Sequence, residues 1–367
     1  MPVTPADTAA KRAPDWVHSG SVPRLDALRA VAVFLVLVAH WNWDAPLSRF
    51  VGPVFRLGVT LFFTLSGFSM TLLLLREHAT SGTVSLGEFY RRRILRTFPS
   101  YYVYVIVSLG LAALGSAPIK WKYFGAAAAY VMCYMPHLEN VRNIAHASYL
   151  AVELHFSLIW PVVLLCAGMR RAGQFLLVYV CGAPLLRYGI WALHIDWLDI
   201  DFASITEMSS AATGALLAFV VRREFFPRVG RWLSALPLFW AVSGMALLVL
   251  SHELSRSGKY RILLIDPVAA IGCTMIVGGL VLAQSTISNR ALDNRVTASL
   301  GAISYNLILW QQPFVDTQIF GSYSPGWLRL VAAVAAATAS YQLVEKPFLQ
   351  LAERWRSEGS HRQTQIK

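Results

Sequence analysis

The stretch DALRAVAVFLVLVAHWNWD, residues 26–44, decides the fold class of this chain. It predicts a membrane-spanning helix, yet it holds Arg29 and His40 eleven residues apart, which is roughly 16 Å along a helix axis. An ionisable side chain inside a membrane is costly, so each of the two is a candidate functional residue. The structural alternative is that the arginine extends to the interface and the histidine hydrogen-bonds a neighbouring helix.

The composition extends this interpretation to the whole chain. Of its 367 residues, 56% are hydrophobic and 14% are charged, whereas about 25% of a soluble domain is charged. We therefore predict an all-α, polytopic integral membrane bundle. Basic cytoplasmic loops account for the net charge of +12, so we expect no nucleic-acid partner. The four cysteines lack the spacing of a metal site, so we expect no metal.

Apolar runs of about 20 residues predict ten membrane-spanning helices. They fall near residues 28–45, 55–75, 98–115, 149–169, 173–193, 203–221, 232–251, 262–284, 300–319 and 326–345. A further run at 123–135 is short for a crossing and suits a re-entrant or interfacial segment. If it does not cross, most basic residues lie on the side of the N-terminus, as the positive-inside bias requires. We therefore expect both termini in the cytoplasm, facing the inner side of a bacterial cell membrane.

We predict three regions along the chain. Residues 1–23 are polar and lack the apolar core of a signal peptide, which predicts a disordered cytoplasmic tail. Residues 24–348 form the membrane domain, and residues 349–367 form a second cytoplasmic tail. No internal repeat is evident in the sequence, which weakens the interpretation of the chain as an inverted-repeat transporter.

Two further groups of charged residues are candidate site residues. In FYRRRILRTFPSYY, residues 89–102, Arg93 and Arg96 share a helix face at the cytoplasmic surface. Arginine suits phosphate groups, so the pair predicts a site for a phosphorylated cofactor, the alternative being plain topological anchoring and lipid contact. Glu153 lies within a predicted span, where a carboxylate is expensive and therefore indicates function.

Other polar residues in the spans leave alternatives open. Asp44 lies four residues after His40, where it could fix the imidazole tautomer or cap the helix end. Ser66–Gly67 favours close helix packing over a nucleophile. 

Two charged or titratable residues are interpreted as structural. His155 is two residues from Glu153, so it points to a different helix face. For Glu345 and Lys346, at the end of the last span, the structural alternative is interfacial anchoring.

The order of these segments carries a family resemblance. The Arg-x10-His pattern, FFTLSGF, RRRILRTFP, LAVELHFSLIWP, SYNLILWQQP and VEKPF together resemble the acyltransferase-3 family of membrane O-acyltransferases, from about Arg24 to Phe348. The resemblance implies transfer of an acyl group, usually acetyl, from acyl-CoA to hydroxyls of glycans, lipids, oligosaccharides or small products. It implies acetyl-CoA as a donor substrate, and we expect no permanently bound cofactor.

The family's functional residues fall on named positions of this sequence. The resemblance implies catalytic roles for His40, Glu153 and Arg29, and donor binding by Arg93 and Arg96. We expect His40 to act as general base on the acceptor hydroxyl or to carry the acyl group in transit.

Two departures from the family pattern bear on the acceptor. Ser148-Tyr149-Leu150 stands where the family often has Trp-Ser-Leu, which implies an altered acceptor pocket. Gln311 stands where the family often has histidine, so this side chain is no acid or base, though it can hydrogen-bond a substrate. The chain stops about twenty residues past its last span, so we expect no extra C-terminal extracytoplasmic domain.

The sequence therefore predicts a membrane O-acyltransferase whose partners are acyl-CoA, a carbohydrate or glycolipid acceptor and membrane lipids. The alternative is a transporter or flippase for a polar lipid or glycan, in which the same intramembrane charges would form a substrate path or proton relay. Consumption of acyl-CoA by the purified protein would separate the two.

Overall fold

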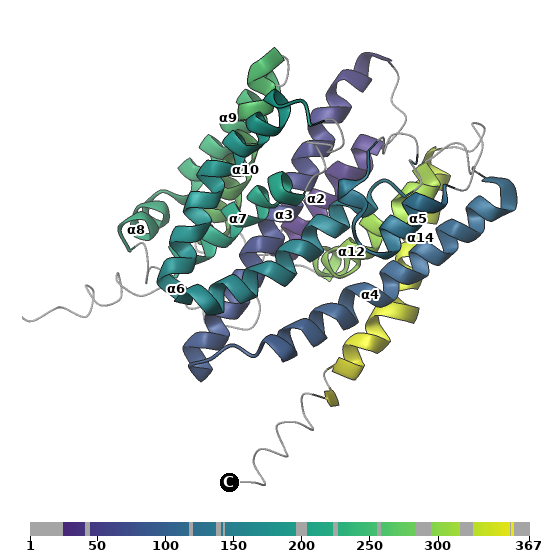
Figure 1. The fold of residues 1–367 in the computed structure, drawn as a ribbon, viewed down its shortest axis with the longest axis horizontal. Coiled ribbons are helices and arrows are strands. Elements are labelled where there is room, and N and C mark those ends of the chain that lie inside the picture. The colour runs from purple at the N-terminus through teal and green to yellow at the C-terminus, as the bar shows by residue number, and fades with distance from the viewer. Residues whose placement is uncertain are drawn as a thin grey trace, which may run out of the picture.

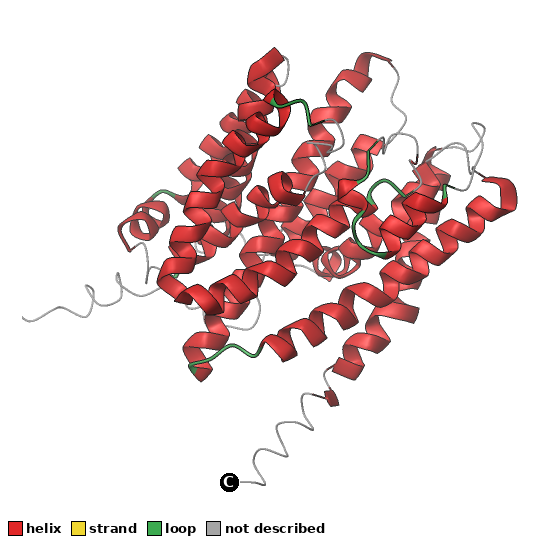
Figure 2. Cartoon of the chain, viewed as in Figure 1, coloured by secondary structure: helices red, strands yellow, loops and turns green. Residues whose placement is uncertain are grey.

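All regular secondary structure in the described part of the chain is helical. A computed structural model describes residues 25–40, 45–116, 120–136, 141, 144–195, 204–222, 227–254, 258–283, 295–315, 326–352 and 354–355. Every regular element in these residues is a helix, and none is a strand (Figure 2). The predicted all-α fold class is confirmed. The predicted tail over residues 1–23 lies outside the described residues, as does most of the C-terminal tail.

Eleven α-helices make up the bundle in these residues (Figure 1). They are α2 Leu25–His40, α3 Ala45–Ser81, α4 Leu86–Leu111, α5 Trp121–Ala128, α6 Ala147–Ala192, α7 Ser204–Val221, α8 Pro227–Ala235, α9 Pro237–Leu254, α10 Gly258–Leu282, α12 Arg295–Val315 and α14 Gly326–Ser340. Short π-helical turns, η2 Ala112–Ser116 and η5 Tyr341–Glu345, extend α4 and α14. Among the described residues, seven helices are long and apolar enough to cross a membrane.

The outer helices carry large apolar side chains on their exposed faces. Ile106 of α4, Val178 of α6 and Val242 of α9 are 67%, 72% and 70% exposed. Such surfaces would be unfavourable in water, but they face hydrocarbon in a bilayer, where the helices satisfy their own backbone groups. The distribution therefore agrees with an integral membrane bundle.

The long helix α3 lies at the centre and packs against α2, α6, α7 and α10 (Figure 1). Its contact with α7 depends on two glycines. A Cβ added at Gly67 would lie 1.9 Å from the carbonyl oxygen of Ala211, and one added at Gly214 would lie 2.0 Å from that of Thr64. Because no larger residue fits so close an approach, the packing role predicted for Ser66–Gly67 is confirmed.

The predicted spans at 149–169 and 173–193 belong to one helical element, α6. Its path breaks at Gly168, where φ is 73° and ψ is 159°, a conformation that glycine adopts readily and other residues rarely do. The two spans therefore meet at a single-residue turn rather than a loop.

The segment at 123–135 forms α5 and the 3-10 turn η3 Met132–Tyr134. Eight helical residues span only about 12 Å, too short to cross the hydrocarbon core, as the sequence predicts.

One predicted boundary is wrong: α9 begins at Pro237 instead of residue 232. Proline lacks the N–H that would continue α8, so residues 227–235 form a separate short helix.

Candidate active site

Glu153 of α6 is held inside the bundle by two polar contacts. Its Oε1 accepts hydrogen bonds from Arg93 Nη2 at 2.6 Å and from Ser66 Oγ at 3.1 Å. Arg93 belongs to α4 and Ser66 to α3, so the carboxylate joins three helices that are distant in sequence. Pairing with a cation and a further hydrogen bond make a buried carboxylate tolerable.

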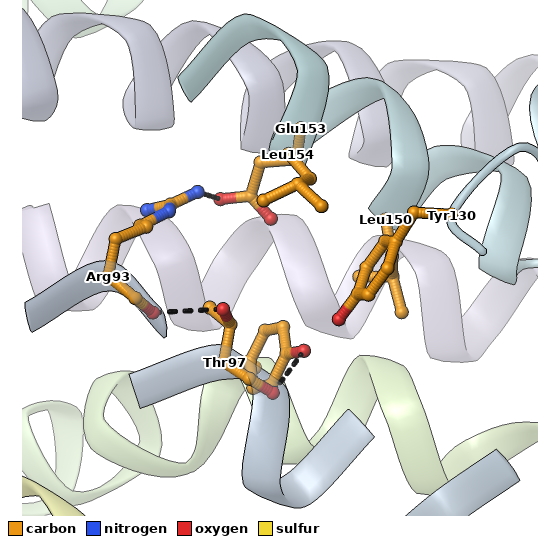
Figure 3. A pocket seen from close by; sticks show the side chains of 7 residues that line it. Arg93, Thr97, Tyr130, Leu150, Glu153 and Leu154 are labelled. Atoms are coloured by element: carbon orange, nitrogen blue, oxygen red, sulfur yellow. Dashed lines mark hydrogen bonds and ion pairs between the residues drawn. The ribbon is translucent and has the colours of Figure 1, made fainter. Parts of the chain in front are cut away.

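A pocket opens beside this ion pair (Figure 3). It encloses about 210 Å³, counting the space that opens outward, and is lined by Arg93, Thr97, Tyr130, Leu150, Glu153, Leu154 and Tyr305. The enclosed part of this space is about the size of one water molecule, so a larger ligand group must displace the side chains around it. Of the predicted site residues, Arg93 and Glu153 line it, whereas Arg29, His40 and Arg96 do not.

Arg29 lies near the same carboxylate. Its Nη1 donates to Asp26 Oδ1 at 3.0 Å and its Nη2 donates to Ser69 Oγ at 3.0 Å, and Glu153 is within electrostatic range. Ser66 and Ser69 are three residues apart, so α3 presents both hydroxyls to the charged groups. Sequence analysis missed Ser69, although this spacing within LSGFS was a usable signal.

Arg96 pairs with a carboxylate of the last helix. Its Nε lies 3.6 Å from Oε1 of Glu345, whose Oε2 accepts a hydrogen bond from Asn306 Nδ2 at 2.5 Å. Glu345 is only 1% exposed, so it is a buried partner of α4 and not the interfacial anchor of the structural alternative. The Arg96 side chain remains 40% exposed and is the more accessible of the two predicted donor-binding arginines.

His40 is the last residue that the structure describes in α2. Its Nδ1 lies 2.8 Å from the carbonyl oxygen of Val36. A carbonyl can only accept, so Nδ1 carries the hydrogen and Nε2 carries the lone pair of the neutral ring. Phe55 contacts the imidazole edge-on at 4.9 Å and contacts Tyr149 at 5.5 Å. Asp44, the predicted partner, lies outside the described residues.

The sequence model of the acyltransferase-3 family, an acyltransferase domain, matches residues 22–343. The chain belongs to this family. Peptidoglycan O-acetyltransferase OatA of Listeria monocytogenes serovar 1/2a (strain ATCC BAA-679 / EGD-e) is 27% identical over 354 residues, which are 89% of this chain and 55% of that protein. O-acetyltransferase OatA of Staphylococcus aureus (strain NCTC 8325 / PS 47) is 22% identical over 359 residues, 89% of this chain and 57% of that protein. The chain thus spans about half the length of the curated relatives it matches. No solved structure matches it.

The two departures from the acyltransferase-3 pattern are both in the interior. Tyr149 packs between Phe55 and Phe63 of α3, at 5.5 Å and 6.3 Å between ring centroids. Gln311 of α12 is 1% exposed, and neither atom of its amide has a hydrogen-bond partner in the described residues. Its contact with a substrate stays a prediction.

A second buried imidazole was missed by sequence analysis. His146 directly precedes α6, seven residues before Glu153 and hence on the same face of the helix. Its ring contacts Tyr104 edge-on at 5.1 Å and lies near the backbone of Leu309. Burial, and then the nearby charge of His40, lower the pKa of His146 to about 3, so the ring is neutral at physiological pH. His155, in contrast, lies 2.7 Å from Ser204 Oγ through Nδ1, which agrees with a structural role.

A four-residue charge cluster lies apart from the pocket. Arg187 of α6 pairs with Glu207 of α7 at 3.0 Å and with Asp266 of α10, which also pairs with Arg56 of α3. Each residue was visible as a single charge within or beside an apolar run, but nothing in the sequence showed that the four meet. Among the described residues, no group of three or more His, Cys, Asp and Glu side chains is placed to hold a metal ion.

Proposed function

We propose that this protein is a membrane O-acetyltransferase that moves an acetyl group from acetyl-CoA to a hydroxyl of a glycan, lipid-linked sugar or oligosaccharide. The observation that carries the proposal is the Arg93–Glu153 pair beside a small pocket in a chain of the acyltransferase-3 family. Relatives named as O-acetyltransferases, one of them for peptidoglycan, favour acetyl and a carbohydrate over the transporter alternative.

The donor enters from the cytoplasm in this proposal. Arg96, half-exposed on α4, binds a phosphate of CoA, and Arg93 holds the inner end of the donor near the pocket. Arginine forms bidentate, charge-assisted hydrogen bonds with phosphate, which suits this task. The acetyl thioester reaches the pocket as the lining side chains move apart, while the nucleotide part of CoA remains outside it.

His40 performs the proton chemistry or carries the acetyl group. Because Nδ1 donates to the Val36 carbonyl, Nε2 is the atom that takes the proton of the acceptor hydroxyl or bonds to the acetyl carbon. Glu153 orients the reacting groups through Arg93, and Arg29 contributes positive charge near the thioester. We also propose that the protein lies in the inner membrane and that both of its termini are in the cytoplasm.

The decisive experiment measures acetyl-CoA consumption by the purified protein in lipid nanodiscs. We expect CoA thiol release that depends on added cell-envelope glycans, and mass spectrometry of those glycans should show a mass increase of one acetyl group. A transporter would move glycan without releasing CoA. Rapid denaturation during turnover, followed by peptide mass spectrometry, distinguishes an acetylated His40 from direct transfer.

A further inference from the structure

Tyr130 is a pocket residue that neither the charge pattern nor the family resemblance indicates. It is 6% exposed, and its hydroxyl has no hydrogen-bond partner among the described residues. Figure 3 shows this hydroxyl turned toward the pocket that holds Arg93 and Glu153. A buried hydroxyl normally finds a partner, so a donor left over in a pocket indicates that a ligand supplies the acceptor.

The neighbouring tyrosines differ from Tyr130 in this respect. The hydroxyls of Tyr101, Tyr102 and Tyr305 donate to the backbone carbonyls of Ala127, Ala128 and Thr97, at 2.8, 3.0 and 3.1 Å. All three side chains are therefore structural. Tyr130 lies among them without such a bond.

The backbone and ring contacts hold Tyr130 in place. Its φ of 56° is in the left-handed region, which is unfavourable for a bulky residue and persists only where the surroundings impose it. Its ring stacks on Tyr101 at 4.1 Å and on Phe98 at 5.2 Å, while its N–H donates to the Ala127 carbonyl at 2.8 Å. The hydroxyl is thus preorganised at a fixed point of the pocket wall.

We propose that the Tyr130 hydroxyl donates a hydrogen bond to the carbonyl oxygen of the acetyl thioester and stabilises the negative charge that develops there. This inference rests on the proposed function. In direct transfer, the acceptor oxygen bonds to the acetyl carbon and the C–S bond breaks. The proton of the acceptor hydroxyl passes to His40 and then to the CoA thiolate, which leaves as free CoA thiol. Tyr130 keeps its proton throughout.

The electrostatics of the pocket favour this role. Burial, together with Tyr305 and other neighbours, raises the pKa of Tyr130 above its ordinary value, so the group is a neutral donor at every physiological pH. A donor that is fixed before the reaction requires no reorganisation when the oxyanion forms, and it acts in a site that excludes most water. Arg93, which also lines the pocket, adds positive charge beside the reacting carbonyl.

The test compares Tyr130→Phe with Tyr102→Phe. Both changes delete one hydroxyl and keep the ring, but Tyr102 donates to the backbone instead of the pocket. We expect Tyr130→Phe to lower kcat for acetyl transfer by roughly 10²–10³-fold with little change in the KM for acetyl-CoA, as for loss of an oxyanion donor. Tyr102→Phe should leave kcat within a few-fold of wild type. Wild-type kcat in Tyr130→Phe would overturn the inference.

A binding measurement makes the test independent of the acceptor. Acetonyl-CoA, a ketone that keeps the carbonyl oxygen, and a propyl thioether of CoA, which lacks it, are titrated into each protein. Wild type and Tyr102→Phe should prefer the ketone by about three- to ten-fold, as one net hydrogen bond implies, and Tyr130→Phe should lose that preference. An unchanged preference contradicts the role of Tyr130. Failure of wild type to bind either analogue contradicts the proposed donor and the inference together.

Discussion

At the scale of single residues, the charged side chains inside this bundle are held in position by hydrogen bonds and ion pairs. Glu153 is bonded to Arg93 and Ser66, and Glu345 is bonded to Asn306 and lies near Arg96. Removing one member of such a pair leaves an uncompensated charge, which usually costs about 3–5 kcal/mol. Substitutions at these positions therefore need controls for folding before a loss of activity is assigned to chemistry.

His40→Ala should abolish acetyl transfer while expression and membrane insertion stay normal. The reason is that no other group is proposed to take the hydroxyl proton or the acetyl group. Turnover is measured on purified protein, with size-exclusion chromatography as the folding control. Near wild-type turnover would show that His40 has a structural role and not a catalytic one.

Arg96→Ala should raise the KM for acetyl-CoA by about ten-fold or more and change the KM for the acceptor little, because a charge-assisted phosphate contact is worth roughly 1.5–3 kcal/mol. Arg92→Ala is the matched control, since Arg92 belongs to the same basic cluster but pairs with Glu88 at 3.6 Å. If both changes alter the KM for acetyl-CoA equally, Arg96 serves as a topological anchor and does not bind the donor.

His146 should not titrate in the range where activity is measured. The pKa of His146 in the folded protein is about 3, below the ordinary histidine value. The ring is therefore neutral at every pH well above 3, and it gains a proton only as the pH falls toward 3. We expect His146→Asn to keep the shape of the kcat/KM profile between pH 5 and 8, whatever its effect on the rate. A displaced inflection in that profile would contradict this assignment.

At the scale of elements, the crossing of α3 and α7 tolerates no side chain at its glycines. Gly67→Ala should lower the Tm of the detergent-solubilised protein, because its Cβ would lie 1.9 Å from the Ala211 carbonyl oxygen and overpacking costs roughly 1–3 kcal/mol. Gly182→Ala in α6 is the control: nothing lies within 4 Å of an added Cβ there, and alanine favours a helix. A Tm unchanged in Gly67→Ala would mean that the two helices cross at a greater distance.

At the scale of the whole molecule, the orientation in the membrane follows from the segment at 123–135. If this segment does not cross and the N-terminus is cytoplasmic, we expect Lys120 outside the cell and Arg171 inside. Single cysteines at these two positions, in a background without the four native cysteines, are treated with an impermeant thiol reagent on intact cells. Position 120 should react directly and position 171 only after permeabilisation. Labelling of both from outside would mean that 123–135 crosses.

The bundle was predictable because length and hydropathy suffice to place helices in a membrane. The boundary that was missed, the start of α9, depends on local chemistry, the missing N–H of Pro237. The charged candidates were predictable because burial makes charges conspicuous. Their pairing was not, since Glu345 meets Arg96 only through tertiary packing. Tyr130 carries no signal in sequence because its unusual φ and the position of its hydroxyl in the pocket arise from the packing around it.

The charge cluster of Arg56, Arg187, Glu207 and Asp266 has a consequence for biogenesis. The four residues belong to α3, α6, α7 and α10, which leave the ribosome one after another. Arg56 and Arg187 enter the membrane before Asp266 has been synthesised. An isolated charge is costly in lipid, so the early helices must wait at the insertion machinery or be shielded there until α10 arrives. Synthesis that stops before α10 would thus leave a partly inserted chain exposed to membrane proteases.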